Sequence, residues 1–251
     1  GIGRALCLAL ADEKAKLVLA ARNEVRLEEL KREVESKGGQ AVVVPTDVTD
    51  EAACRRLVER AVAQWGRLNI LVNNAGVTMW TRFEEITDLS IFERLMRINY
   101  LGGVYCTHHA LPHLKRTQGL VVGVASVAGL TGVPTRTGYA ASKHALFGFF
   151  DSLRVELAGT GVGVTMIAPD FVLSEIHRRA LGADGRPLGK SPLQEAEIMT
   201  AEACAAQIVR AMGKRDRLLI TSLRGKVGRW IRMFSPALVD RIAGKAIRER
   251  K

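Results

Sequence analysis

The sequence predicts an α/β fold in which a doubly wound parallel sheet is covered by helices on both faces. Short apolar runs rich in Val, Ile and Leu alternate along the chain with longer stretches of helical periodicity. The apolar runs are nearly continuous, as expected for strands buried on both faces of a sheet. With 251 residues, of which 47% are apolar and 25% charged, the chain has the size and composition of one globular domain.

Apolar runs and periodic stretches define the expected elements. The predicted strands are Lys16–Ala21, Gln40–Pro45, Leu68–Asn73, Gly119–Ala125, Val162–Ala168 and Arg217–Thr221. The predicted helices are Glu24–Lys37, Glu51–Trp65, Asp88–His113, Ala140–Ala158 and Ala201–Met212. Repeated strand–helix units of this length indicate a Rossmann-like domain. We assign this domain to residues 1–221 and treat 222–251 as a separate tail.

The chain opens inside a glycine-rich turn. Gly1-Ile2-Gly3 is followed at once by the apolar pattern of a helix, and no strand comes before it. A doubly wound sheet normally begins with a strand that leads into such a turn. We therefore expect the first strand of the fold to be absent from this chain, as in an N-terminally clipped sequence.

Composition excludes several classes of protein. The four cysteines are scattered without a CxxC pair, so neither a disulfide framework nor a metal site is expected. Scattered reduced cysteines favour a cytoplasmic location. There is no run of about 18 apolar residues, so no transmembrane helix is predicted. The net charge of +11 is concentrated at the C-terminal end, where residues 214–251 contain twelve Lys and Arg against three Asp and Glu.

The N-terminal third of the chain carries the features of a nucleotide site. A helix that begins at Gly1-Ile2-Gly3 exposes unpaired N–H groups and the positive end of its dipole, which suits a pyrophosphate. Arg22 directly follows the first predicted strand, where an acidic residue would hold a ribose 2′-hydroxyl and an arginine accommodates a 2′-phosphate. No acidic residue stands there. The sequence therefore favours NADP(H) over NAD(H), although a solvated arginine or an ordinary glycine turn would look the same.

Tyr139 and Lys143 are the strongest chemical feature. Their i, i+4 spacing puts both side chains on one face of a helix. An ammonium close to a phenol favours the phenolate, so we expect Lys143 to lower the pKa of Tyr139 and make it a general acid or base near neutral pH. Ser126 follows the strand Gly119–Ala125, where its hydroxyl can bond a carbonyl oxygen.

Taken together, the motifs resemble the short-chain dehydrogenase/reductase family over residue 1 to about residue 221. The resemblance implies that Asn99, Ser126, Tyr139 and Lys143 form the catalytic set, in which Tyr139 exchanges the proton, Ser126 orients the substrate oxygen and Asn99 holds a water. It also implies that Lys143 holds the nicotinamide ribose and that Asp47 and Val48 contact the adenine. The residues that carry the resemblance are Gly1-Ile2-Gly3, Asp47-Val48, Asn73-Asn74-Ala75-Gly76, Asn99, Ser126, Tyr139 and Lys143.

The segment after the strand Val162–Ala168 departs from the family pattern. The family usually has Pro-Gly there, whereas this chain has Pro169-Asp170, followed by Phe171 and Val172. Ser174 keeps a hydroxyl where the family has a threonine. By resemblance, we expect Pro169, Val172 and Ser174 to contact the cofactor, together with Asn74, Ala75 and Gly76.

A lid over the substrate is expected at about residues 174–200, and it is rich in glycine and apolar residues. Met79, Trp80 and Val133 supply further apolar wall, so a bulky, largely apolar alcohol or ketone is the predicted substrate. Core packing explains most of these residues equally well. His177 is either a pocket residue or a surface histidine, and the surface position is the commoner one.

The tail predicts an amphipathic basic helix from residue 222, followed by a second one after Pro236. Leu223, Val227, Trp230 and Ile231 recur at helical spacing among arginines and lysines. Such a helix either packs on its own subunit or a partner, which is the commoner arrangement, or lies on an anionic membrane. There is no interleaved aromatic platform for nucleic acid, so no nucleic-acid partner is expected.

The leading hypothesis is an NADP(H)-dependent oxidoreductase that interconverts a secondary alcohol and a carbonyl compound. The alternative is a regulatory or membrane-peripheral interaction protein that binds NADP on the same fold without turnover. Family members usually pair through helices that flank the active site, so a homo-oligomer is expected by resemblance.

Overall fold

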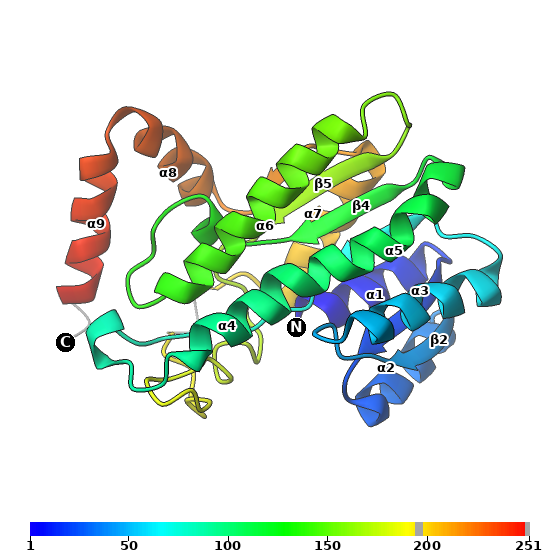
Figure 1. The fold of residues 1–251 in the computed structure, drawn as a ribbon, viewed down its shortest axis with the longest axis horizontal. Coiled ribbons are helices and arrows are strands. Elements are labelled where there is room, and N and C mark those ends of the chain that lie inside the picture. Colours follow the sequence, from blue (N-terminus) through cyan, green and yellow to red (C-terminus); the bar gives the residue numbers. More distant parts are fainter. Residues whose placement is uncertain (194–197, 249–251) are drawn as a thin grey trace.

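The parallel strands lie in two groups, as Figure 1 shows. In this computed structural model, which describes residues 1–193 and 198–248, β1 (Lys16–Ala21) pairs with β2 (Gln40–Pro45). A second group has the order β3 (Ile70–Asn73), β4 (Leu120–Val124), β5 (Gly163–Ala168) and β6 (Leu218–Ile220). All pairs are parallel, which confirms the predicted α/β class.

The first element is helix α1 (Ile2–Asp12). Within the described residues, no strand pairs β1 with β3, so the sheet is interrupted between its two groups. The remaining helices are α2 (Glu24–Ser36), α3 (Glu51–Trp65), α4 (Ser90–Met96), α5 (Gly102–Thr117), α6 (Thr137–Glu156), α7 (Ala201–Lys214), α8 (Leu223–Phe234) and α9 (Pro236–Arg248).

Helices cover both faces of the sheet because β4 and β5 are apolar on both faces. Every residue of β4 is buried. Val121 packs into a cluster with residues of α3, α5 and α6, among them Phe150, whereas Val122 packs into a second cluster with α1 and α7. This alternation explains why the strands read as continuous apolar runs.

The predicted helix Asp88–His113 is not one regular helix. It consists of α4, a π-helical turn at Arg97–Leu101 and α5, which continues to Thr117. A π turn keeps the helical direction and adds one residue, so a periodicity analysis reads through it. Its position matters because Asn99 lies within the turn.

The segments next to the strand ends differ in detail from the prediction. Helix α6 begins at Thr137 rather than at Ala140, so Tyr139 lies in its first turn and shares a helical face with Lys143. Two 3₁₀ turns, Phe83–Glu85 and Val127–Gly129, connect strand ends to helices; Ser126 caps the second by accepting a hydrogen bond from the Ala128 amide.

The tail forms two helices where the amphipathic pattern predicts them. Helix α8 leaves β6, and α9 runs back along one side of the molecule (Figure 1). The last predicted tail residues, 249–251, and the lid residues 194–197 lie outside the described part of the chain.

Candidate active site

A cavity of about 2060 Å³ opens at the carboxyl ends of β4 and β5. This is where ligands bind in doubly wound sheets, and the volume exceeds the ~300–1,000 Å³ of a site for one small molecule. It therefore has room for a dinucleotide and a substrate together. The predicted site residues that line it are Gly1, Ile2, Gly3, Arg22, Asn74, Ala75, Gly76, Ser126, Tyr139, Lys143, Pro169, Val172 and Ser174.

One end of the cavity is formed by the start of α1 and the segment after β3. A Cβ added to Gly3 would lie 2.6 Å from the Asn74 amide nitrogen, and one added to Gly1 would lie 3.2 Å from the Ser174 Cβ. A Cβ on Gly3 would overlap the Asn74 side chain, and one on Gly1 would crowd Ser174, so the glycines let the start of α1 lie close to these two residues. The exposed N–H groups of α1 point to this end, which suits a phosphate group.

The charge at this end comes from arginines. Arg4 and Arg26 line the cavity, and each forms an ion pair, with Glu33 and Glu175 respectively. Arg22 follows β1 and forms no ion pair with any residue that the structure describes. Its guanidinium is thus available to a ligand.

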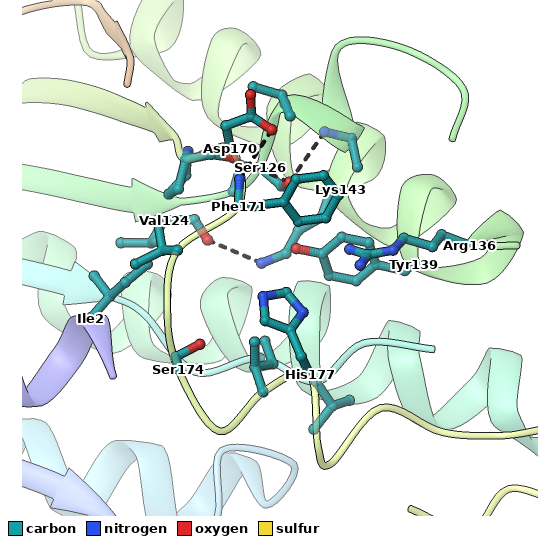
Figure 2. A pocket seen from close by; sticks show the side chains of 18 of the residues that line it. Ile2, Val124, Ser126, Arg136, Tyr139, Lys143, Asp170, Phe171, Ser174 and His177 are labelled. Atoms are coloured by element: carbon teal, nitrogen blue, oxygen red, sulfur yellow. Dashed lines mark hydrogen bonds between the residues drawn. The ribbon is translucent and has the colours of Figure 1, made fainter. Parts of the chain in front are cut away.

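Ser126, Tyr139 and Lys143 meet in the middle of the cavity (Figure 2). Ser126 follows the end of β4, whereas Tyr139 and Lys143 come from α6. The Lys143 amine lies 5.8 Å from the centre of the Tyr139 ring and donates a hydrogen bond of 3.0 Å to the Val124 carbonyl. All three side chains are at least nine-tenths buried. The structure thus brings together the three groups that the sequence predicts to act on a substrate oxygen.

The pKa of Tyr139 is raised in the protein alone, whereas the sequence predicts that it is lowered. Burial raises it above its ordinary value, against the opposing effects of a hydrogen bond from Ser126 and the nearby charge of Arg136. Burial also lowers the pKa of Lys143 to about 8. The prediction that Lys143 lowers the pKa of Tyr139 is therefore wrong for the protein alone. The Lys143 amine is directed at the Val124 carbonyl, and burial of the Tyr139 hydroxyl raises its pKa more than Ser126 and Arg136 lower it.

Asn99 lies beside the cavity without lining it. Its side-chain oxygen accepts from the Val77 amide at 2.8 Å, and its nitrogen donates to the Val77 carbonyl and the Ser142 hydroxyl. A Cβ on Gly76 would lie 3.3 Å from the same oxygen. Asn99 therefore fixes the loop that follows Asn74-Ala75-Gly76, and its role in holding a water stays a prediction.

Asp47 and Val48 are also outside the lining of the cavity. The Asp47 carboxylate accepts from the Thr49 amide, which is the main cause of its lowered pKa, and the charge of Arg22 adds to the effect. Val48 packs so tightly against Gly102 that an added Cβ would lie 2.8 Å away. Their contact with an adenine stays a prediction.

The sequence did not single out Arg136, which is one helical turn before Tyr139. Its guanidinium is buried and lies 4.1 Å from the Trp80 ring, 5.2 Å from the Phe171 ring and 5.8 Å from the Tyr139 ring. His177 is buried against Phe171 and lines the cavity, so the expected surface position is wrong. Arg136 is the N-cap residue of α6, three residues before Tyr139, and this spacing is the signal that could have found it.

The apolar walls are partly as predicted. Trp80 and Val133 line the cavity, as does Ile176 of the lid, whereas Met79 is fully buried in a separate core cluster with Leu181. The lid is tied down by backbone hydrogen bonds from Trp80 to Leu181 and from Leu181 to Thr78, both 2.9 Å. Lid and strand-end loop thus form one continuous wall.

Comparison with known proteins shows which family the chain belongs to. The short chain dehydrogenase family model matches residues 1–183. A Pinus massoniana protein named 11-beta-hydroxysteroid dehydrogenase is 35% identical over 96% of this chain and 69% of its own length. The chain belongs to the short-chain dehydrogenase family.

Other relatives of this short-chain dehydrogenase agree. A mouse protein named dehydrogenase/reductase SDR family member 7B is 33% identical over the whole of this chain and 80% of its own length. The structure of an alcohol dehydrogenase from Thermococcus sibiricus, complexed with 5-hydroxy-NADP, aligns with a TM-score of 0.75 and 25% identity. That alignment covers 88% of this chain and 91% of the archaeal one. The protein is therefore an NAD(P)-dependent oxidoreductase that acts on CH–OH or C=O groups.

The residues of this short-chain dehydrogenase fit a nicotinamide dinucleotide. Gly1 and Gly3 line the cavity at the start of α1, where the unpaired N–H groups of the helix suit the pyrophosphate. Lys143 and the Asn74–Gly76 segment line the same cavity further in. They would hold the ribose and the nicotinamide side of the cofactor.

Replacing Lys143 by methionine should change how the stability of the cofactor-free enzyme depends on pH. The folded state loses the Lys143 proton near pH 8, whereas an unfolded lysine keeps it to about pH 10.4. The wild type should therefore gain stability relative to Lys143→Met as the pH rises between these values, by roughly 3 kcal/mol in total. Urea unfolding of both proteins from pH 7 to 10.5 measures this, and a constant difference would contradict it.

Proposed function

We propose that this enzyme interconverts a bulky, apolar secondary alcohol and its ketone with NADP(H), using Tyr139 as the general acid or base. The observation that carries the proposal is the meeting of Ser126, Tyr139 and Lys143 in one cavity with the glycine turn of α1. A protein that only binds the cofactor has no chemical need for a buried serine, tyrosine and lysine at its centre. Turnover therefore explains the arrangement better than binding alone.

The chain's own residues supply proton transfer and orientation. The nicotinamide supplies or accepts the hydride when it is bound. Ser126 donates a hydrogen bond to the substrate oxygen, and Tyr139 gives its proton to that oxygen during reduction and takes it back during oxidation. The positive charge of Arg136 and a hydrogen bond from Ser126 favour the phenolate that Tyr139 becomes. The lid and the walls exclude water.

The substrate end of the cavity supports a bulky apolar compound. Trp80, Val133, Phe171 and Ile176 line it, and Ile231 of α8 faces the same space. A polycyclic compound the size of a steroid fits this character, and relatives named hydroxysteroid dehydrogenases act as a guide. We therefore propose a steroid-sized ketone or alcohol as the substrate class.

The preference for NADP(H) rests on Arg22. It follows β1, lines the cavity and has no ion pair among the described residues, while its neighbours Arg4 and Arg26 are paired. An unpaired guanidinium at this place suits a 2′-phosphate. The structural neighbour that binds 5-hydroxy-NADP supports the same preference.

The outer face of α8 supports contact with an anionic membrane surface. Trp230 and Phe234 are 60% and 81% exposed, and Arg229 and Arg232 lie beside them. No helix in the described part of the chain is long and apolar enough to cross a bilayer. We propose a cytoplasmic enzyme with peripheral membrane contact; the homo-oligomer and the lack of a nucleic-acid partner also stay proposals.

Tyr139→Phe should abolish turnover and leave cofactor binding intact. Removing the hydroxyl removes the proton donor, so NADPH oxidation with a steroid ketone should fall by at least ~10²–10⁴-fold while the Kd for NADPH changes less than about twofold. Tyr100→Phe is the matched control because its ring packs in the core away from the cavity. Equal turnover in Tyr139→Phe and the wild type would refute the mechanism.

Arg22→Ala should weaken NADPH binding much more than NADH binding. Losing a charge-assisted contact to the 2′-phosphate costs about 1.5–3 kcal/mol, which corresponds to roughly 10- to 100-fold in Kd. NADH has no such phosphate, so its Kd should stay nearly constant. Fluorescence titration of both cofactors measures this, with the exposed Arg67→Ala as control. Parallel losses for the two cofactors would rule out the assignment.

A Trp230→Ser/Phe234→Ser double variant should float less with anionic vesicles. Both side chains are exposed on α8, so replacing them removes apolar area that would enter the lipid interface. Flotation with phosphatidylcholine–phosphatidylserine vesicles is compared with Val25→Ser, which removes an exposed apolar residue from α2. Unchanged flotation, or a change of molar mass in light scattering instead, would count against membrane contact.

A further inference from the structure

The strongest feature outside the reacting groups is an ion pair that joins the tail to the end of β5. Asp170 follows Pro169, and Arg224 lies in the first turn of α8. The two guanidinium nitrogens donate to the two carboxylate oxygens at 2.8 and 2.7 Å. This bidentate geometry is the strongest form of such a contact.

The Asp170 carboxylate is shielded and fully engaged. Its side chain is only 11% exposed, and it also accepts from the Ser222 hydroxyl at 2.7 Å and the Phe171 amide at 3.0 Å. Burial alone would raise its pKa, but the hydrogen bonds from Arg224 and Ser222 outweigh this effect and keep the pKa below its ordinary value. Asp170 thus stays charged and depends on Arg224 as its only ionic partner among the described residues.

The backbone at Asp170 needs no glycine. Asp170 is absent from the residues with positive φ in the described chain, and its amide donates to the Thr221 hydroxyl at 3.1 Å. The departure from Pro-Gly therefore costs no backbone strain. It adds a carboxylate whose partners, Ser222 and Arg224, belong to the tail.

The ion pair continues into the wall beside the catalytic tyrosine. The Arg224 guanidinium lies 5.3 Å from the Phe171 ring, and the Arg136 guanidinium lies 5.2 Å from the same ring. Figure 2 shows Asp170, Phe171, Arg136 and Tyr139 along one side of the cavity. The start of the tail is therefore connected to Tyr139 by a series of direct contacts.

Beyond Arg224, the tail lines the same cavity with apolar side chains. Gly225 packs closely on the body, since an added Cβ would lie 2.8 Å from Ile220 and 2.9 Å from Val127. The apolar residues of the tail that line the cavity are Val227 and Ile231 of α8 and Val239, Ile242 and Ala243 of α9. The direction in which α8 leaves its first turn decides where these side chains lie.

We propose that Asp170 and Arg224 are positioning residues that latch the tail in place as the far wall of the substrate end, and thereby set the preference for bulky apolar substrates. This inference rests on the proposed function for its substrate class. A large apolar substrate contacts the wall formed by α8 and α9, whereas a small ketone needs only the region around Ser126 and Tyr139. Opening the latch therefore separates the two kinds of substrate.

The test uses the full chain with Arg224→Met, which keeps most of the side-chain length but cannot bond Asp170. Hydrogen exchange of the backbone amides in residues 223–234 should become at least about tenfold faster, while exchange in α6 stays as it was. The KM for a steroid ketone should rise about tenfold, and that for a short aliphatic ketone less than about threefold, with kcat falling much less than KM rises. Arg224→Lys, which keeps the charge without the fork, should give intermediate values.

Arg229→Met is the matched control, because Arg229 lies on the same helix, is exposed, does not line the cavity and has no ion pair among the described residues. It should behave as the wild type in each assay. Unchanged exchange in Arg224→Met, or equal rises of KM for both ketones, would overturn the proposal.

The exchange measurement and the binding of a steroid ketone, followed by tryptophan fluorescence, need no turnover. An inactive wild type would therefore refute the proposed reaction, while the latch would still stand or fall on whether Arg224→Met speeds exchange and weakens steroid binding.

Discussion

The hydrogen bond from the Lys143 amine to the Val124 carbonyl joins the helix that carries the reacting tyrosine to the strand end that carries the serine. A lysine is rarely buried without a partner, because removing its charge from water costs several kcal/mol. Here the amine lies between the Tyr139 ring and the carbonyl end of β4, so its position fixes the distance between α6 and the strand. The same burial that makes the lysine costly lowers its pKa and keeps the site away from bulk water.

The cavity has a polar end and an apolar end, and Lys143 lies between the two. At the polar end, the glycine turn of α1 lies close to the side chains of Asn74 and Ser174, and arginines gather beside β1. At the apolar end, Trp80 and Phe171 contribute rings, and the buried Arg136 lies against both of them. Tyr139 and Ser126 are at the junction, where a hydride donor from one end and a carbonyl from the other would meet.

The tail contributes side chains to the same cavity. In the sequence its basic, amphipathic pattern is compatible with packing on the protein or with contact to a membrane, and in the structure its arginines divide between two positions. One arginine, Arg224, is bound to a shielded carboxylate, while Arg229 and Arg232 remain on the outer face with Trp230 and Phe234. The division follows from the helix period: residues on one face contact the body, and those on the other are left to solvent or to a surface.

The sequence by itself determined the fold class, the helices α2, α3, α6 and α7 and six strands within a few residues, and the trio Ser126, Tyr139 and Lys143, because strand burial and helical spacing are local patterns. It also predicted the glycine turn and Arg22, since both follow directly from their place beside an element. Tertiary structure alone decided that Arg136, Phe171 and His177 share the cavity. It also decided that Asn99 binds the Val77 backbone instead of lining the cavity, and that burial raises the pKa of Tyr139. It also paired Asp170 with Arg224, 54 residues apart. Burial and contacts between distant segments are set by how helices pack on the sheet, and no local pattern encodes that packing.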